Sequence, residues 1–254
     1  MIDFILLGLR DLPLKQEYRS DRDDVVSEFF IPCLANSIQY DRTIEFISVK
    51  SLSTLTFGLE NIQDHHAKIR LVSGHRFTTS DLNSIVKLFD QHSTRRFNGR
   101  ISLDNKIGSI IKDNKISRLK KVIEEFKVEV KVAIPNSEYV DGAFEERMGI
   151  FRDTNDDVVA FSGTSNVTFD AENRNFESVD VFTSWDDKTR VENKINNFEN
   201  LWTNRTNYVE IFDLVYAEKK NLLKYTSEWA VYRLILEFKL FHNYFFCILI
   251  KIHS

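Results

Sequence analysis

The chain has 254 residues, a formal net charge of −4 and a hydrophobic content of 43%. A chain of this length forms one large domain or two small ones, and its composition is that of an ordinary folded protein. The negative net charge excludes a basic field over the whole molecule. Any nucleic-acid binding must therefore come from a local patch.

Cysteine usage and the first residues indicate a cytoplasmic protein. Cys33 and Cys247 lie far apart among apolar neighbours and do not form a metal-ligand spacing, so we expect two buried free thiols. The N-terminus lacks the basic segment of a secretory signal and is read as a strand or a short helix. No pattern of residues predicts a metal or another cofactor.

Helical and strand patterns alternate in the first part of the chain. Apolar residues at helical spacing predict a helix over Asp23–Ser37, which Pro32 must kink or end early. The next elements are predicted as a strand over Arg42–Val49, a helix over Ser51–Asn61, a strand over Lys68–Ser73 and a helix over Ser80–Asp90.

The same alternation continues to about residue 215. It predicts a helix over Ile116–Val128, a strand over Val128–Ile134, a hairpin of Arg147–Phe151 and Val158–Ser162, a strand over Val179–Ser184 and a helix over Val191–Trp202. Alternating elements of these lengths favour an α/β fold with a mixed, mostly parallel sheet flanked by helices.

The tail from Trp229 to Ser254 differs from the rest in its apolar character. Its uninterrupted apolar part is too short to span a bilayer, and Arg233, Glu237 and Lys239 break the longer window. We therefore expect a C-terminal apolar helix that packs on the domain or on a neighbouring subunit. The predicted organisation is one domain over residues 1–225 and this tail over residues 226–254.

The most informative stretch reads FEERMGIFRD at residues 144–153 and FSGTSN at residues 161–166. It resembles the signature of the phospholipase D superfamily, in which a strand presents His-x-Lys, an aspartate follows, and Gly-Ser/Thr-x-Asn closes a phosphate site. The resemblance implies a phosphodiesterase site at Glu145, Arg147, Asp153, Thr164, Asn166 and Glu177.

Further segments are similar to one branch of that superfamily, the domains found at the front of bacterial helicases in restriction and phage-defence systems. This similarity covers roughly residues 15–220 and implies a nuclease-type domain of a defence system. The matching segments are Tyr18–Ser20, Asp23–Asp24, Phe29–Leu34, Tyr40–Arg42, Lys68–Gly74, Asn175–Ser178, Val181–Trp185 and Phe198–Asn204.

The departures from the family pattern concern the catalytic pair itself. Glu145 stands where the resemblance implies a nucleophilic histidine, and Arg147 stands where it implies a lysine that neutralises phosphate oxygens. Glu45-Phe46-Ile47-Ser48 also stands where Gly-Tyr/Phe-Phe-Ser is expected. A carboxylate repels phosphate by ~4 kcal/mol at about 4 Å and an effective dielectric of ~20. We expect catalysis by the family mechanism to be lost.

Three hypotheses follow. The first is a degenerate phospholipase D-like subunit that binds DNA or a protein partner, as a homodimer or paired with an active paralogue or helicase subunit, because such sites are built from two facing halves. The second is a working nuclease in which Glu145, Asp153 and Glu177 hold Mg²⁺. The third is a truncated relic. The candidate nucleic-acid contacts are Arg147 with the loop arginines Arg95, Arg96 and Arg100.

Simpler interpretations exist for the same residues. Asp153 and Glu177 are also consistent with plain surface carboxylates, and the three loop arginines with a solvated loop. The Gly163–Asn166 run alone is a common turn sequence. The run supports a phosphate site only because it follows the strand that carries Glu145 and Arg147.

Overall fold

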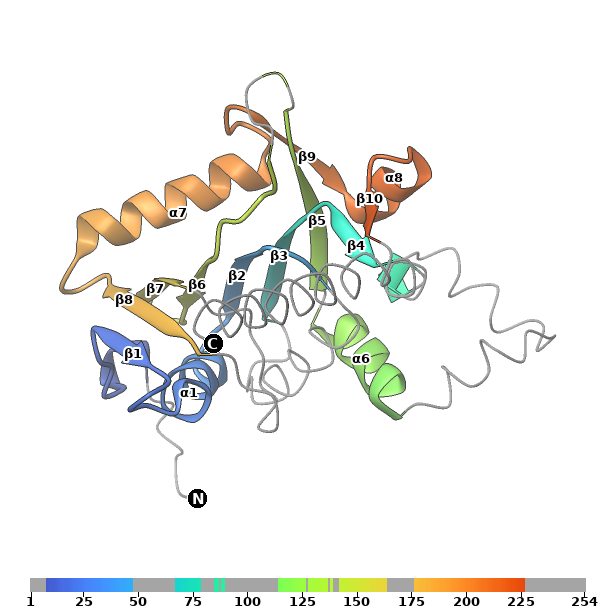
Figure 1. Cartoon of the computed structure of the whole chain (residues 1–254). Helices are drawn as coiled ribbons and strands as arrows, with labels where there is room; N and C mark the ends of the chain where they lie inside the picture. Colours follow the sequence, from blue (N-terminus) through green and yellow to red (C-terminus); the bar gives the residue numbers. More distant parts are fainter. Residues whose placement is uncertain are drawn as a thin grey trace, which may run out of the picture.

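Eight of the strands in the described part of the chain form one mixed sheet (Figure 1). The computed structural model describes residues 8–47, 67–78, 85–86, 88–89, 114–126, 128–136, 138, 142–163 and 176–226. In spatial order the strands are β1 (Glu17–Arg19), β8 (Ser178–Thr183), β7 (Val158–Gly163), β6 (Met148–Arg152), β2 (Gln39–Ile44), β3 (Lys68–Gly74), β5 (Val128–Pro135) and β9 (Val209–Asp213). A separate parallel pair joins β4 (Arg76–Thr78) and β10 (Lys224–Thr226).

The strand directions correct one expectation. Only β2–β3 and β3–β5 pair in parallel among the described strands of this sheet, and the other neighbours run antiparallel. The expected mostly parallel sheet is therefore wrong, although a mixed sheet flanked by helices is confirmed. The physical reason is that β6 and β7 are joined by a tight turn and β8 adds antiparallel to β7, whereas parallel strands need long crossovers.

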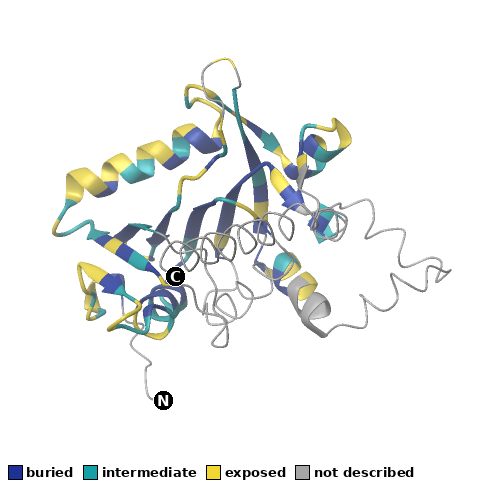
Figure 2. Ribbon diagram, in the orientation of Figure 1, coloured by how far each residue is buried: buried dark blue, intermediate teal, exposed yellow. Residues whose placement is uncertain are grey.

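Helices cover both faces of the sheet, and Figure 1 shows α7 on one side with α1 and α6 on the other. The helical elements are a short 3-10 turn (Leu9–Asp11), a π-helical segment η2 (Val26–Phe30), α1 (Ile31–Ala35), α6 (Asn114–Glu125), α7 (Lys188–Trp202) and α8 (Leu214–Lys219). Figure 2 shows that the central strands are almost entirely buried between these layers. This arrangement gives two hydrophobic cores.

The larger core contains an aromatic cluster between the sheet and the first helical segment. Phe29 and Phe30 of η2 meet the rings of Phe151 and Phe161, with centroids 5.2–6.4 Å apart. The smaller core holds Phe198 and other apolar residues of α7 against the opposite face. Burying one such side chain contributes roughly 1.5–3 kcal/mol, so these helices are held by packing.

Several predicted elements are confirmed in kind with shifted ends: the helix interrupted near Pro32, the strand at residue 68, the hairpin and the helix ending at Trp202. Pro32 cannot donate a backbone hydrogen bond, and the chain changes there from π-helical to α-helical bonding. The predicted helices at Ser51–Asn61 and Trp229–Ser254 lie outside the described residues, as does most of Ser80–Asp90. The C-terminal helix and the boundary at residue 226 stay predictions.

Buried Cys33 is a free thiol, as expected, and burial raises its pKa. Cys247 lies outside the described residues. No helix within the described ranges is long and apolar enough to cross a membrane.

Candidate functional site

The strand ends next to the motif residues lie together along one edge of the sheet. This edge is the one formed by the ends of the strands, not by an outer strand. β2 and β3 end there, and β6 and β8 begin there, because β2 pairs antiparallel with β6. Gly74 closes β3 at a point where a Cβ would lie 2.3 Å from the carbonyl oxygen of Glu45 and 3.2 Å from that of Phe144. Glycine thus lets three backbone segments converge at this edge.

The sheet register also decides which motif side chains share a face. Arg42, Gly149, Phe161 and Val181 lie in one row across four strands. Side chains two residues apart on a strand point to the same face, so Arg147 projects to the same face as residue 149. Arg147 therefore shares the face that carries Arg42, the face covered by η2 and α1.

Arg42 is a buried cation within this face. Its guanidinium lies 4.5 Å from the ring centroid of Phe161 and 5.9 Å from that of Phe30. Gly149 makes room for this stack, because a Cβ there would fall 2.3 Å from the Phe161 ring. Burial lowers the pKa of Arg42, Glu177 opposes that lowering, and Arg147 adds to it. Arg42 therefore interacts electrostatically with both motif residues.

Arg147 forms an ion pair with Glu45 through its Nη2 atom. The two side chains come from positions 102 residues apart and are 25% and 31% exposed. Glu45 follows β2, at the position where the family pattern expects glycine. The cation at the position where the resemblance implies a lysine is thus paired with a carboxylate of the same chain.

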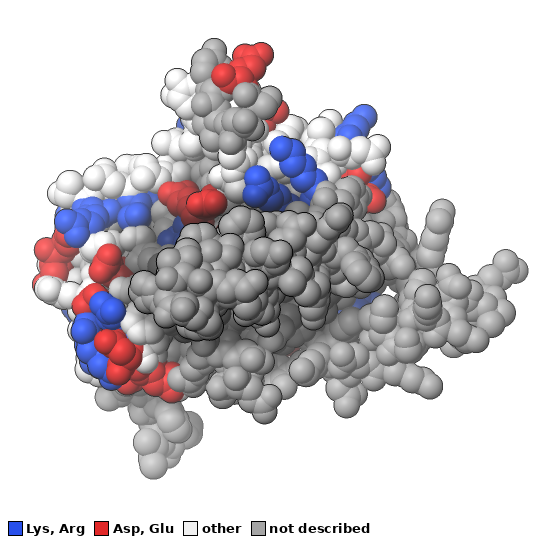
Figure 3. All heavy atoms as spheres, viewed as in Figure 1, with Lys and Arg blue, Asp and Glu red and all other residues white. Residues whose placement is uncertain are grey.

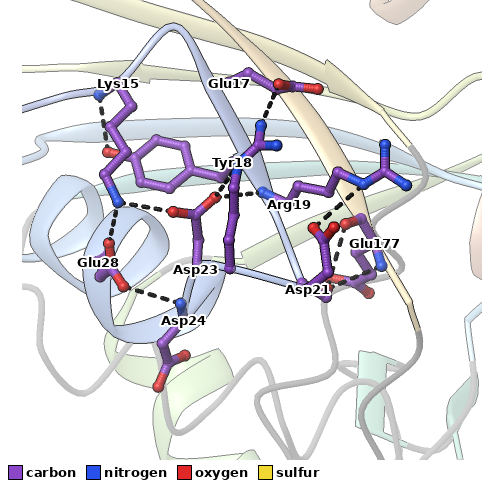
Figure 4. A network of polar contacts seen from close by, with 11 residues as sticks. Lys15, Glu17, Tyr18, Arg19, Asp21, Asp23, Asp24, Glu28 and Glu177 are labelled. Carbon is purple, nitrogen blue, oxygen red and sulfur yellow. Dashed lines mark hydrogen bonds and ion pairs between the residues drawn. The ribbon is translucent and has the colours of Figure 1, made fainter.

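Glu177 is held at the start of β8 by its backbone. Its N–H donates to Ser20 Oγ at 2.9 Å, and its carbonyl accepts from the Ser20 N–H at 3.0 Å. Figure 4 shows Glu177 beside Arg19 at the end of a polar network that begins at Lys15. Ser20 thereby ties the first strand of the sheet to the acidic motif position, and the Glu177 side chain is buried.

Asp153 does not join the other motif residues. It follows β6 at the end opposite Arg147, and six residues of strand place it about 20 Å away. Its Oδ2 accepts from the Leu9 N–H at 2.8 Å, and its Oδ1 accepts from the N–H groups of Asn155 and Asp157 at 2.9 and 3.0 Å. Through these hydrogen bonds the carboxylate stabilises the hairpin turn and links the N-terminal segment to it.

The position of Asp153 therefore contradicts both its assignment to the motif site and the Mg²⁺ hypothesis. Glu145, Asp153 and Glu177 do not converge, and within the described ranges no three acidic, histidine or cysteine side chains are grouped as a metal site. Glu145 itself is exposed at the site edge. The remaining predicted site residues, Thr164, Asn166, Arg95, Arg96 and Arg100, lie outside the described residues.

Two residues near the site carried little sequence signal. In the sequence Arg42 belongs only to the similar segment Tyr40–Arg42, and His75 lies outside the motif. The structure places His75 directly after Gly74, buried, with its pKa lowered by burial and by the nearby cations Lys224 and Arg76. In the sequence, only its position directly after an apolar strand that ends in Gly74 indicates that His75 lies near the site.

Comparisons with known proteins add distant likenesses in structure. No family model and no curated protein matches the sequence. NucT from Helicobacter pylori is 12% identical, with 77% of this chain and 97% of that chain covered and a TM-score of 0.44. TrmBL2, an archaeal chromatin protein with a novel mode of DNA binding, is 13% identical, with coverages of 78% and 56% and a TM-score of 0.36. Neither likeness decides the family.

Proposed function

We propose that this chain is a phospholipase D-like domain with an inactivated phosphodiesterase site. It serves as a DNA-binding or partner-binding subunit of a bacterial anti-phage defence or restriction system. The observation that carries the proposal is the ion pair of Arg147 with Glu45. It adds a carboxylate at the site edge where the motif resemblance implies phosphate binding.

The charges of the site oppose phosphodiester chemistry. Glu45, Glu145 and Glu177 contribute three negative charges, and Arg42 with Arg147 contribute two positive ones, which leaves one net negative charge. Each carboxylate at about 4 Å from a phosphate repels it by ~4 kcal/mol at an effective dielectric of ~20. The imidazole that would attack phosphorus is replaced by a group that itself repels the substrate.

The alternative of an active nuclease has less support. The route through a metal held by Glu145, Asp153 and Glu177 loses a ligand, because Asp153 is bound to backbone N–H groups at the other edge of the sheet. Catalysis would then need a nucleophile outside the motif.

The defence role and the partner follow from the family resemblance. A single half-motif per chain is expected to face a second copy, an active paralogue or a helicase subunit across a two-fold interface. DNA is the expected nucleic-acid partner, and the cell compartment is expected to be the cytoplasm. The mass of the purified protein in solution tests the homodimer directly.

The test of inactivation restores the site stepwise. Glu145→His with Arg147→Lys recreates the His-x-Lys pair but leaves Glu45 beside the new lysine. We expect this double variant to gain little hydrolysis of bis(4-nitrophenyl) phosphate in EDTA, and the triple variant with Glu45→Gln to gain at least tenfold more. Nucleophile, cation and local charge act as a unit, so single changes should do less.

Glu210→Gln, combined with the same double change, is the matched control because Glu210 is an exposed acid on β9 at the far side of the sheet. Metal-independent cleavage by the parent protein would overturn the proposal of an inactivated site. A triple variant that folds and keeps the parental mass but stays inert would overturn the idea that the rest of the site is intact.

A further inference from the structure

A cavity of about 670 Å³ lies apart from the motif residues, between the N-terminal segment and the start of α7. Its lining comes from two stretches of the chain, within residues 10–17 and 180–190. These stretches include parts of β1 and β8, which Figure 1 shows side by side at one end of the sheet. The volume falls within the ~300–1,000 Å³ that is usual for ligand pockets.

The cavity lies along a part of β8 that no described strand covers. Pairing with β1 continues as far as Gln16, whose carbonyl oxygen accepts from the Val181 N–H at 2.8 Å. The register would place Leu14 opposite Thr183, but the Leu14 N–H donates to the Leu12 carbonyl oxygen at 2.8 Å in a tight turn. The N-terminal segment thereby leaves β8, and the edge of β8 stays open next to the cavity.

Two residues of the cavity wall have hydrogen-bond donors to offer. Successive N–H groups alternate between the two sides of a strand, and Ser184 donates to Val158 on β7, so the Thr183 N–H points away from β7. Neither this N–H nor the indole N–H of Trp185 donates to an acceptor in the described part of the chain. An extended peptide that lies along a strand edge presents carbonyl oxygens to such donors.

The cations of the cavity wall are already paired. Figure 3 shows basic and acidic side chains interspersed over the described part of the visible face, and Figure 4 shows Lys15 between two carboxylates. The ion pairs of the lining cations are Arg10 with Asp157, Lys15 with Asp23 and Glu28, and Arg190 with Asp187. The guanidinium groups of Arg10 and Arg190 also lie over the rings of Trp185 and Phe182, at 5.3 and 4.7 Å.

Two carboxylates of the wall remain uncompensated. Asp180 and Asp186 are exposed, and neither pairs with a cation within the described ranges. Asp186 accepts a hydrogen bond from the Thr183 hydroxyl at 3.0 Å. The charges of the cavity therefore complement a cationic ligand, and they oppose a nucleic acid, whose phosphates would be repelled by both carboxylates.

We propose that this cavity binds an extended segment of a partner protein that carries lysine or arginine. The segment adds to the open edge of β8 as a strand. A backbone carbonyl oxygen of the segment accepts from the Thr183 N–H, and its basic side chains pair with Asp180 and Asp186. Main-chain hydrogen bonds supply affinity in this mode of binding, and the side chains supply specificity. The proposal rests on the partner-binding form of the proposed function and names the chemistry of the partner.

The experiment measures binding of the full chain to a blocked, fluorescein-labelled peptide of sequence Val-Lys-Val-Lys-Val by fluorescence polarisation at low salt. The comparison ligands are the peptide Val-Glu-Val-Glu-Val and lysine amide, which competes for the carboxylates without adding a strand. The lysine peptide should bind at least about fivefold tighter than either, because both its backbone and its charges match the cavity.

Substitutions in the wall test the two kinds of contact separately. Asp180→Asn and Asp186→Asn should each weaken the lysine peptide by up to about fivefold, whereas Glu210→Gln, an exposed acid on β9, should leave binding unchanged. Thr183→Pro removes the backbone donor and should weaken binding roughly 2- to 12-fold, while Thr183→Val keeps the donor and should bind like the parent. Melting temperatures show which variants fold. The Asp180 variant loses no described ion pair, so the test does not depend on the proline variant.

Several results would overturn the proposal. These are equal binding of the lysine and glutamate peptides, lysine amide that binds as tightly as the peptide, and no peptide binding up to about 1 mM. An oligothymidylate that displaces the lysine peptide would assign the cavity to nucleic acid and refute the proposal. The phosphodiesterase assay is independent of these measurements. Metal-independent cleavage by a parent protein that binds the lysine peptide would overturn the inactivated site alone.

Discussion

Replacement of Asp153 by alanine tests whether this motif residue supports the fold or the site. The side chain is buried, and its two oxygens accept three hydrogen bonds from the backbone N–H groups of Leu9, Asn155 and Asp157. A hydrogen bond to a charged acceptor contributes ~1.5–3 kcal/mol, and a buried donor left without a partner carries a desolvation penalty. Water can enter the opened turn, so we expect a total loss of roughly 3–5 kcal/mol in unfolding free energy.

That loss corresponds to a fall of roughly 6–20 °C in melting temperature for a chain of this size. Asp153→Asn keeps one acceptor oxygen and should lose about half as much. The measurement is thermal unfolding followed by circular dichroism, with oligothymidylate binding of each variant measured at a temperature where it is folded. Asp180→Ala, an exposed carboxylate on β8, is the control and should change stability by at most ~0.5 kcal/mol.

The structural role of Asp153 would be refuted by an alanine variant as stable as the parent. It would also be refuted by a variant of unchanged stability that loses nucleic-acid binding, since that result places the carboxylate in the site. The three hydrogen bonds of the carboxylate argue against both outcomes, and the distance of about 20 Å from Arg147 along β6 argues further against the second.

Two further predictions concern pH and the tail. The folded-state pKa of His75 is lowered, so the unfolded chain binds more protons, and stability should rise with pH from that lowered pKa up to about 6.5 and then level off. Urea unfolding between pH 5 and 8 should show this slope in the parent and a flatter one in His75→Gln; equal slopes would contradict it. Deleting the apolar sequence after Thr226 should lower the melting temperature or split an oligomer, since each large side chain it holds would contribute roughly 1.5–3 kcal/mol when buried. A truncated protein that keeps the parental stability and mass would show that the tail is dispensable.

The hairpin and α7 were predictable from the sequence because their signals are local. Alternation around the turn at Thr154–Asp157 and an apolar stripe ending in Trp202 are properties of short windows, and both elements are present with ends shifted by a few residues. Three-residue strands such as β1 and β4 carry too little pattern to be recognised. Their existence depends on a neighbouring strand that offers its backbone groups.

Strand direction and the composition of the site depend on contacts between distant segments. The resemblance grouped Asp153 with Arg147 by spacing, but spacing along an extended strand separates two side chains instead of joining them. The ion pair of Arg147 with Glu45 joins positions 102 residues apart, and the sequence marked Glu45 only as a departure from a pattern.

The sequence by itself determined the residue types at the motif positions, including Glu145 at the position where the resemblance implies a histidine. Only the tertiary structure decided which charges meet. β2 pairs antiparallel with β6, and this pairing brings Glu45 against Arg147 and leaves Asp153 at the far edge. The physical reason is that electrostatic interactions act over a few ångströms in space, whatever the separation along the chain.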